Sequence, residues 1–146
     1  KILKICDKKP ISLEVFADDY LNMKKQAEKI NTWGKNVYVK IPVSNSKGKF
    51  TGKVIKELNE QNIKLNITAV YTAKQTKKIL NVINKKTKVI ISIFAGRAGD
   101  TGKDPIPEIK KSLKFSNLQH LPLNSLLTPN FRNSPDEFLK SVENAT

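Results

Sequence analysis

Four short apolar segments of this sequence carry polar residues where a buried β-strand would carry none. The segments span residues 11–16, 36–42, 65–70 and 88–94, and their polar residues are Glu14, Lys40, Asn66, Thr68 and Ser92. A strand covered on both faces of a sheet is almost wholly apolar. Because side chains alternate between the faces of a strand, these residues are predicted to share one face, and the other face is left apolar. An acid, an amine, an amide and hydroxyls at matching depth indicate a site of chemistry.

Lys40 has the most specific chemistry of the set. Its neighbours Val39 and Ile41 predict a desolvated side chain, and desolvation favours the neutral amine. A neutral amine attacks carbonyl carbons and forms Schiff bases. The alternative is a lysine on an edge strand whose ammonium reaches solvent, the more common fate of lysine.

Helical patterns separate the four segments. One begins at Asp18 and Asp19 and ends near Gly34, and the others cover 54–58, the region from Thr72, where Gln75 completes a capping-box spacing, and the region after 104–105. Alternating strands and helices predict a parallel α/β sheet with right-handed crossovers. Polar residues toward the carboxyl ends of such strands are typical of the mouth of a (β/α) barrel. Alternation also predicts Val70 on the polar face with Thr68, and Ala69 on the apolar face.

The glycine-containing segments predict loops. The string GKFTGK at 48–53 is one residue short of a phosphate-binding loop, and Val54 stands where that motif needs Ser or Thr, so a turn before a helix is predicted. Gly96, Gly99 and Gly102 predict a tight loop after the fourth strand, from which Arg97 projects toward an anionic group. A fifth strand over 118–127 and a short helix after 134 are the candidates in the tail.

Composition limits the remaining possibilities. The chain has 146 residues, 38% of them apolar, one Cys and one His, which fits one domain without a membrane span, a disulfide or a metal site. We therefore expect a cytoplasmic protein. The net charge is +14, yet only Arg97 and Arg132 of the 27 basic residues are arginines and the lysines are spread along the chain. This distribution argues against nucleic-acid binding.

The four segments also resemble a known family. The strings ISLEVFADD, NVYVKIPVS, LNITAVYTAKQ and IISIFAGRAGDTG are similar to successive blocks of the transaldolases and the related fructose-6-phosphate aldolases, which are TIM-type barrels. The resemblance implies that Lys40 is the Schiff-base nucleophile and that Glu14 and Thr68 move protons with a bound water. It implies substrate-binding roles for Asn66, Ser92, Phe94 and Arg97, the last on the sugar phosphate.

Two positions indicate the transferase subgroup. The aldolases have Gln where this chain has Glu14 and Tyr where it has Phe94. The implied reaction of the pentose phosphate pathway moves a dihydroxyacetone unit from fructose 6-phosphate or sedoheptulose 7-phosphate to glyceraldehyde 3-phosphate or erythrose 4-phosphate. It needs no metal or organic cofactor, and a homo-oligomer is compatible with it. A fructose-6-phosphate aldolase-like lyase and a catalytically inactive fragment are the alternatives.

The resemblance covers part of a barrel. A complete barrel has eight strands, and this sequence offers four clear ones. The family's first strand, with its acid-base Asp, and its second have no counterpart, and the first ten residues read as the end of the helix after that second strand. We expect one partial barrel domain over 1–146, with family-like βα units over 1–115, a divergent tail over 116–146 and weak or no turnover alone. In the tail, Arg132 resembles a second phosphate ligand.

Overall fold

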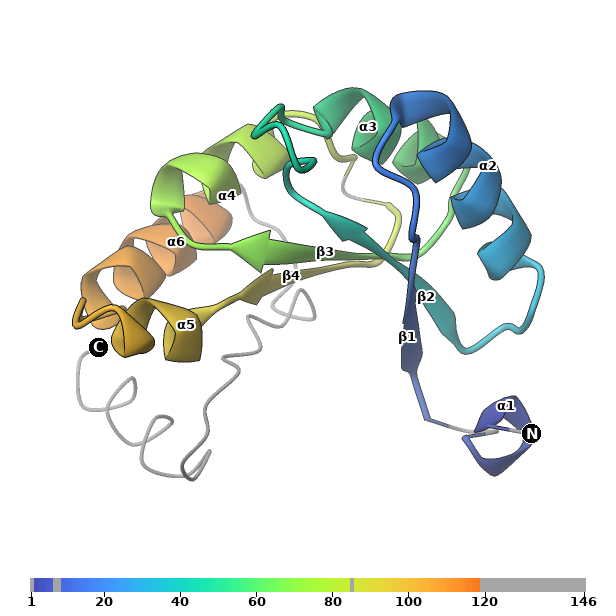
Figure 1. Cartoon of the computed structure of the whole chain (residues 1–146), viewed down its shortest axis with the longest axis horizontal. Helices are drawn as coiled ribbons and strands as arrows, with labels where there is room; N and C mark the ends of the chain where they lie inside the picture. The colour runs from blue at the N-terminus through green and yellow to red at the C-terminus, as the bar shows by residue number, and fades with distance from the viewer. Residues whose placement is uncertain (1, 7–8, 85, 119–146) are drawn as a thin grey trace.

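The fold is one parallel sheet with helices along one side (Figure 1). The computed structural model describes residues 2–6, 9–84 and 86–118. The sheet has the order β1-β2-β3-β4, and all neighbouring pairs in it are parallel. Its strands are β1 (Ile11–Glu14), β2 (Val37–Pro42), β3 (Leu65–Val70) and β4 (Val89–Ile93). The predicted α/β class and the partial (β/α) barrel are confirmed, with strands in sequence order as in consecutive barrel units.

One helix precedes β1, and the other helices follow the strands along the chain. The helices are α1 (Ile2–Ile5), α2 (Tyr20–Asn31), α3 (Gly52–Glu60), α4 (Ala73–Leu80), α5 (Ala95–Asp100) and α6 (Ile106–Leu118). Helices α2, α3 and α4 form an arc over one face of the sheet, α6 lies beside α4, and α1 lies apart, before β1 (Figure 1). None of the helices within the described ranges is long and apolar enough to cross a membrane.

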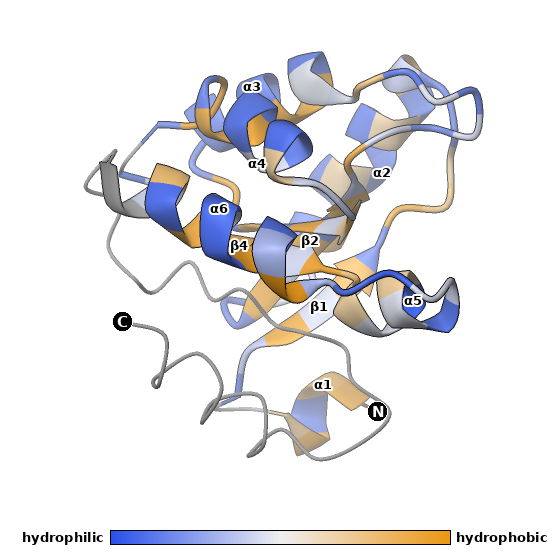
Figure 2. Cartoon of the chain, turned by 90° about the vertical axis from the view of Figure 1, so that its left-hand side faces the viewer, coloured by the Kyte–Doolittle hydropathy of each residue, from blue (hydrophilic) through white to orange (hydrophobic). Residues whose placement is uncertain are grey.

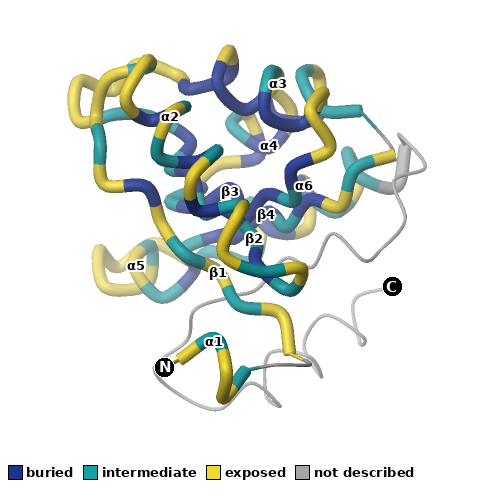
Figure 3. The backbone as a smooth tube through the Cα atoms, turned by 90° about the vertical axis from the view of Figure 1, so that its right-hand side faces the viewer, coloured by how far each residue is buried: buried dark blue, intermediate teal, exposed yellow. Residues whose placement is uncertain are grey.

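The core lies between the sheet and the arc of helices. Val37, Val39 and Ile41 alternate along β2 as completely buried residues, while the residues between them are only half-buried. The strands are largely hydrophobic and the helices are striped with hydrophilic residues (Figure 2). Buried residues follow β2, β3, β4 and the inner helix turns, whereas β1 alternates between intermediate and exposed residues (Figure 3). One apolar face and one polar face were predicted, and β2 shows this division most clearly.

Helix starts follow local capping signals. The Asp19 side chain accepts a hydrogen bond from the Asn22 amide, and Thr72 forms a complete capping box with Gln75. Helix α3 follows a turn in which Gly48 has a φ of 71°, as predicted for the 48–53 string. The prediction of a loop after β4 is wrong, because residues 95–100 form the short helix α5. Gly102 follows this helix with a φ of 76°, a conformation that favours glycine.

An irregularity in β3 corrects the predicted faces. Ile67 pairs with Ile91 and Val70 pairs with Ile93, so β3 has one more residue than β4 over this stretch. Ala69 takes up the extra residue as a bulge with a φ of 57°. Val70 is therefore completely buried in the core and Ala69 is only half-buried, the reverse of the prediction.

The predicted tail elements fall outside the described residues. Leu118, the first residue of the predicted fifth strand, is instead the last residue of α6. The remainder of that strand, the helix after 134 and Arg132 are beyond the part of the chain that the structure describes.

Candidate active site

Glu14 and Lys40 face each other on adjacent strands. They are Cα partners in the β1–β2 register, and the Lys40 Nζ lies 3.0 Å from a Glu14 carboxylate oxygen. The Lys40 side chain is 29% exposed and that of Glu14 is 45% exposed. Lys40 is thus half-buried and paired, not isolated among apolar side chains as the sequence predicted. An amine and a carboxylate in hydrogen-bond reach can exchange a proton directly.

A chain of hydrogen bonds crosses the same face. The Asn66 Nδ2 donates to the Ser12 Oγ at 2.9 Å, and the Ser92 Oγ donates to the Asn66 Oδ1 at 2.8 Å. Asn66 is also the register partner of Lys40. The amide is therefore fixed in one orientation beside the lysine, with its donor toward β1 and its acceptor toward β4.

The Thr68 hydroxyl is buried without a hydrogen-bond partner in the described part of the chain. Thr68 is 2% exposed and pairs in register with Pro42, two residues after Lys40. Leaving a buried hydroxyl unpaired costs about 1–3 kcal/mol. A group kept in this state at a polar site is available to hydrogen-bond a water or a substrate hydroxyl.

Phe94 and Arg97 lie just beyond β4. Phe94 precedes α5 and meets Tyr71 edge to face, with the ring centroids 5.7 Å apart. Arg97 is exposed on α5, with its guanidinium 3.6 Å from the Asp100 carboxylate. The structure thus gathers Glu14, Lys40, Asn66, Thr68 and Ser92 on one face, and places Phe94 and Arg97 after the carboxyl end of β4.

A match to a protein-family model shows to which family the chain belongs. The Transaldolase/Fructose-6-phosphate aldolase model matches residues 1–135, nearly the whole chain. The chain belongs to this family.

Individual members of the transaldolase/fructose-6-phosphate aldolase family are similar to about three quarters of the chain. A probable transaldolase of Carboxydothermus hydrogenoformans is 35% identical over 98 residues, which are 66% of this chain and 42% of that protein. The probable transaldolase of a Sulfurihydrogenibium species is 36% identical over 106 residues, 70% of this chain and 45% of the relative. That of Methanococcus vannielii is 33% identical over 116 residues, covering 78% and 50%. The chain thus spans about half the length of the curated relatives it matches.

Sequence reasoning did not single out three residues that make hydrogen bonds at or near the site of this family member. Ser12 had a signal, because it lies two residues before Glu14 and so on the same face. Gln26 on α2 accepts hydrogen bonds from the Phe16 and Ala17 amides at 2.8 and 2.9 Å and so holds the segment after Glu14. Asp18 accepts two hydrogen bonds from Ser46. The Gln26 and Asp18 contacts join different segments of the chain, so no local sequence pattern predicts them.

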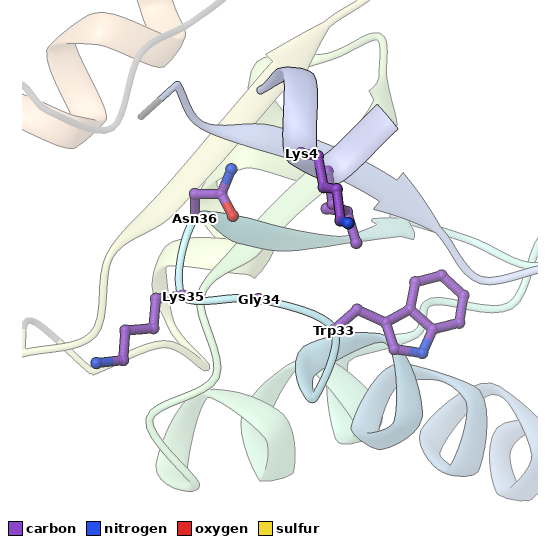
Figure 4. Close-up of a pocket in the computed structure, with 6 residues that line it drawn as sticks. Lys4, Trp33, Gly34, Lys35 and Asn36 are labelled. Carbon is purple, nitrogen blue, oxygen red and sulfur yellow. The ribbon is translucent and has the colours of Figure 1, made fainter. Parts of the chain in front are cut away.

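A separate pocket of about 530 Å³ lies at the other end of β2. Its lining includes Lys4 of α1 and the Trp33–Asn36 segment before the strand, and the Lys4 side chain extends toward the Trp33 ring while Lys35 points away (Figure 4). Lys40 lies in the half of β2 nearer the carboxyl end. The pocket is therefore distinct from the cluster around Lys40.

The described residues contain no group of three or more His, Cys, Asp or Glu residues that could hold a metal ion. The described chemistry of the site is that of an amine, a carboxylate, an amide and hydroxyls.

Proposed function

We propose that this chain carries the Schiff-base centre of a transaldolase, which transfers a dihydroxyacetone unit between sugar phosphates. The observation that supports this most directly is the Lys40–Glu14 pair at 3.0 Å, on the polar face of a partial barrel of this family. A lysine amine beside a proton acceptor on the inner face of a barrel is suited to Schiff-base chemistry with a carbonyl substrate.

The first step is formation of the imine. Lys40 must lose a proton before its lone pair can attack, and Glu14 is the nearest acceptor. The neutral Nζ adds to the ketose C2 carbonyl, and the oxygen takes one proton from the nitrogen and a second from Glu14 and leaves as water. A protonated imine between Lys40 and the sugar results.

The second step breaks the bond between C3 and C4. Glu14, through a water held by the Thr68 hydroxyl, accepts the proton of the C4 hydroxyl, and the C3–C4 electron pair moves into the imine. An aldose phosphate departs, and a three-carbon enamine stays on Lys40. Attack of this enamine on an acceptor aldehyde reverses the steps and forms the new ketose phosphate. The ketose phosphates would be fructose 6-phosphate and sedoheptulose 7-phosphate, and the aldose phosphates glyceraldehyde 3-phosphate and erythrose 4-phosphate.

The other site residues would hold the substrate. The oriented Asn66 amide and the Ser92 hydroxyl suit sugar hydroxyls, and Phe94 would close one wall. Arg97 would exchange its contact with Asp100 for the substrate phosphate, a stronger partner for a guanidinium.

Borohydride trapping tests this proposal. The 146-residue protein is incubated with fructose 6-phosphate and borohydride, and labelled peptides are mapped by mass spectrometry. We expect one sugar adduct, on Lys40, that is lost in Lys40→Met and retained in Lys64→Met, a matched lysine that donates to the Lys35 carbonyl. Adducts spread over many lysines, or retained in Lys40→Met, contradict the proposal. Release of free dihydroxyacetone without an acceptor would favour a lyase over a transferase.

A further inference from the structure

The loops that follow β1 and β2 are joined by one carboxylate that the proposed reaction does not use. Asp18 lies four residues after Glu14, and Ser46 lies six residues after Lys40. One Asp18 carboxylate oxygen accepts from the Ser46 amide at 2.6 Å, and the other accepts from the Ser46 Oγ at 2.7 Å. The Asn45 Nδ2 approaches the Asp18 carbonyl at 3.5 Å. Both oxygens of the carboxylate are thus directed at the neighbouring loop.

Further side-chain hydrogen bonds hold each of the two loops in its own conformation. In the first loop, Gln26 accepts from the amides of Phe16 and Ala17. In the second, the Asn45 Oδ1 accepts from the amides of Lys47 and Lys49 at 3.1 and 2.9 Å. Because each loop is held in its own shape, the Asp18–Ser46 contact transmits the position of one loop to the other.

The location of this contact matters because β1 is at the edge of the described sheet. There β1 pairs with β2 alone, and the last ladder bond toward the loops runs from the Val15 amide to the Lys40 carbonyl at 3.1 Å. Glu14 is the last residue of β1, and its side chain is the more exposed member of the pair with Lys40. A tie between the loops just beyond these residues restrains fraying at this end of the strand pair.

We propose that Asp18 is a positioning residue, whose double hydrogen bond to Ser46 holds the carboxyl ends of β1 and β2 together and so keeps Glu14 against Lys40. The catalytic consequence rests on the proposed function, whereas the restraint on the two strands does not. Displacement of a catalytic group by about 1 Å can reduce a rate by up to about a hundredfold. When the Asp18–Ser46 contact is lost, we expect the Lys40 adduct to appear at least tenfold more slowly. A change of this size is on the order of what the loss of one charge-assisted hydrogen bond produces.

Two readouts on the full chain test the proposal. The first is the rate of borohydride-trapped adduct formation on Lys40 with fructose 6-phosphate, and the second is hydrogen exchange of the Val15 amide measured by NMR. The variants are Asp18→Ala, Ser46→Ala, the double variant and Asp18→Asn, which keeps one acceptor oxygen. The control is Glu60→Ala, which removes a carboxylate that pairs with Lys56 on α3, away from both loops.

The expected pattern distinguishes positioning from general destabilisation. Asp18→Ala slows the adduct and speeds Val15 exchange while the unfolding midpoint changes little, Asp18→Asn restores part of both, and the double variant is no worse than Asp18→Ala. Unchanged Val15 exchange in Asp18→Ala overturns the proposal, whether or not the adduct forms. If the parent chain forms no Lys40 adduct, the proposed function fails for this chain, and Val15 exchange still decides whether Asp18 restrains the two strands.

Discussion

Asn66 and Ser12 are joined by a hydrogen bond of 2.9 Å although β2 lies between their strands. Strands two places apart in a sheet are separated by about 9.6 Å in the plane of the sheet. Side chains as short as Ser and Asn meet across that distance only when the sheet curves toward them. The polar face is therefore concave, and this curvature brings the residues around Lys40 together.

Removal of the Asn66 amide should cost stability as well as function. Asn66→Ala removes the two hydrogen bonds that join Asn66 to the Ser12 and Ser92 hydroxyls, and we expect a loss of about 2 kcal/mol in the free energy of unfolding. Urea denaturation measures it. The exposed Asn81, at the end of α4, provides the control Asn81→Ala, for which we expect a change within about 0.5 kcal/mol. Equal losses of stability at both positions would show that the hydrogen bonds of Asn66 with Ser12 and Ser92 do not stabilise the protein more than a surface amide does.

The unpaired Thr68 hydroxyl should serve function at the expense of stability. Thr68→Val removes a buried polar atom that has no described partner, so we expect stability to stay equal or rise by about 1 kcal/mol, while single-turnover release of glyceraldehyde 3-phosphate from fructose 6-phosphate falls tenfold or more. The same substitution at Thr76 is the matched control, because the Thr76 hydroxyl is 3.0 Å from the Ser112 hydroxyl in the core.

Thr76→Val should destabilise the protein by about 1–2 kcal/mol, because it leaves Ser112 without its partner. Urea midpoints and single-turnover release of glyceraldehyde 3-phosphate, measured side by side, check both variants. A clear loss of stability in Thr68→Val would mean that the Thr68 hydroxyl is satisfied in solution.

Stability should fall in acid through Glu108. The Ala73 amide donates to its carboxylate at 2.7 Å, and this bond, with help from Lys111, holds the pKa of Glu108 below its ordinary value of 4.5. A carboxylate whose pKa is lower in the folded state stabilises that state above pH 4.5, and the contribution is lost as pH falls through the folded pKa. Glu108→Gln should therefore be less stable than the parent at pH 7, and the difference should shrink as pH falls below 4.5 through the folded-state pKa. A difference in urea midpoint that persists unchanged at pH 3 would exclude this ionic contribution.

The stability of the protein should fall as the side chain at position 69 becomes larger, from Gly through Ala to Val. A φ of 57° is strained for residues with a Cβ and worst for β-branched ones. We expect Ala69→Gly to raise stability by about 0.5 kcal/mol, after the entropy of glycine in the unfolded chain is subtracted, and Ala69→Val to lower it by more than 1 kcal/mol. Ala98→Gly on α5 is the control and should lower stability by about 0.5–1 kcal/mol. Thermal unfolding of the four proteins measures this order, and a valine variant as stable as the parent would contradict it.

The sequence predicted those parts of the fold that depend on local signals. Period-two alternation placed Glu14 and Lys40 on one face at matching depth, and the structure makes them register partners. Capping residues such as Asp19 and Thr72 marked the helix starts. Local patterns could not reveal the bulge, because no glycine marks position 69. They also could not reveal the pairing of Asp18 with Ser46 or of Asn66 with Ser12, since these contacts depend on loop approach and sheet curvature.

The desolvated Lys40 was predicted from the apolar residues next to it in sequence. Those neighbours face the opposite side of β2, and the residue that Lys40 actually meets, Glu14, comes from another strand. A side chain's surroundings in a parallel sheet are set by its register partners more than by its chain neighbours.

The extra residue in β3 also determines how the chain could be shortened. Thr68 and Val70 already face opposite sides of the sheet with Ala69 between them, so deletion of Ala69 would make them adjacent and leave both on their present faces. Without Ala69, β3 and β4 have equal numbers of residues between the register pairs on either side of the bulge, so Val70 would still pair with Ile93 and the N-cap of α4 at Thr72 would stay in place. A one-residue deletion at this position would thus straighten the strand and leave the length of the loop after it unchanged.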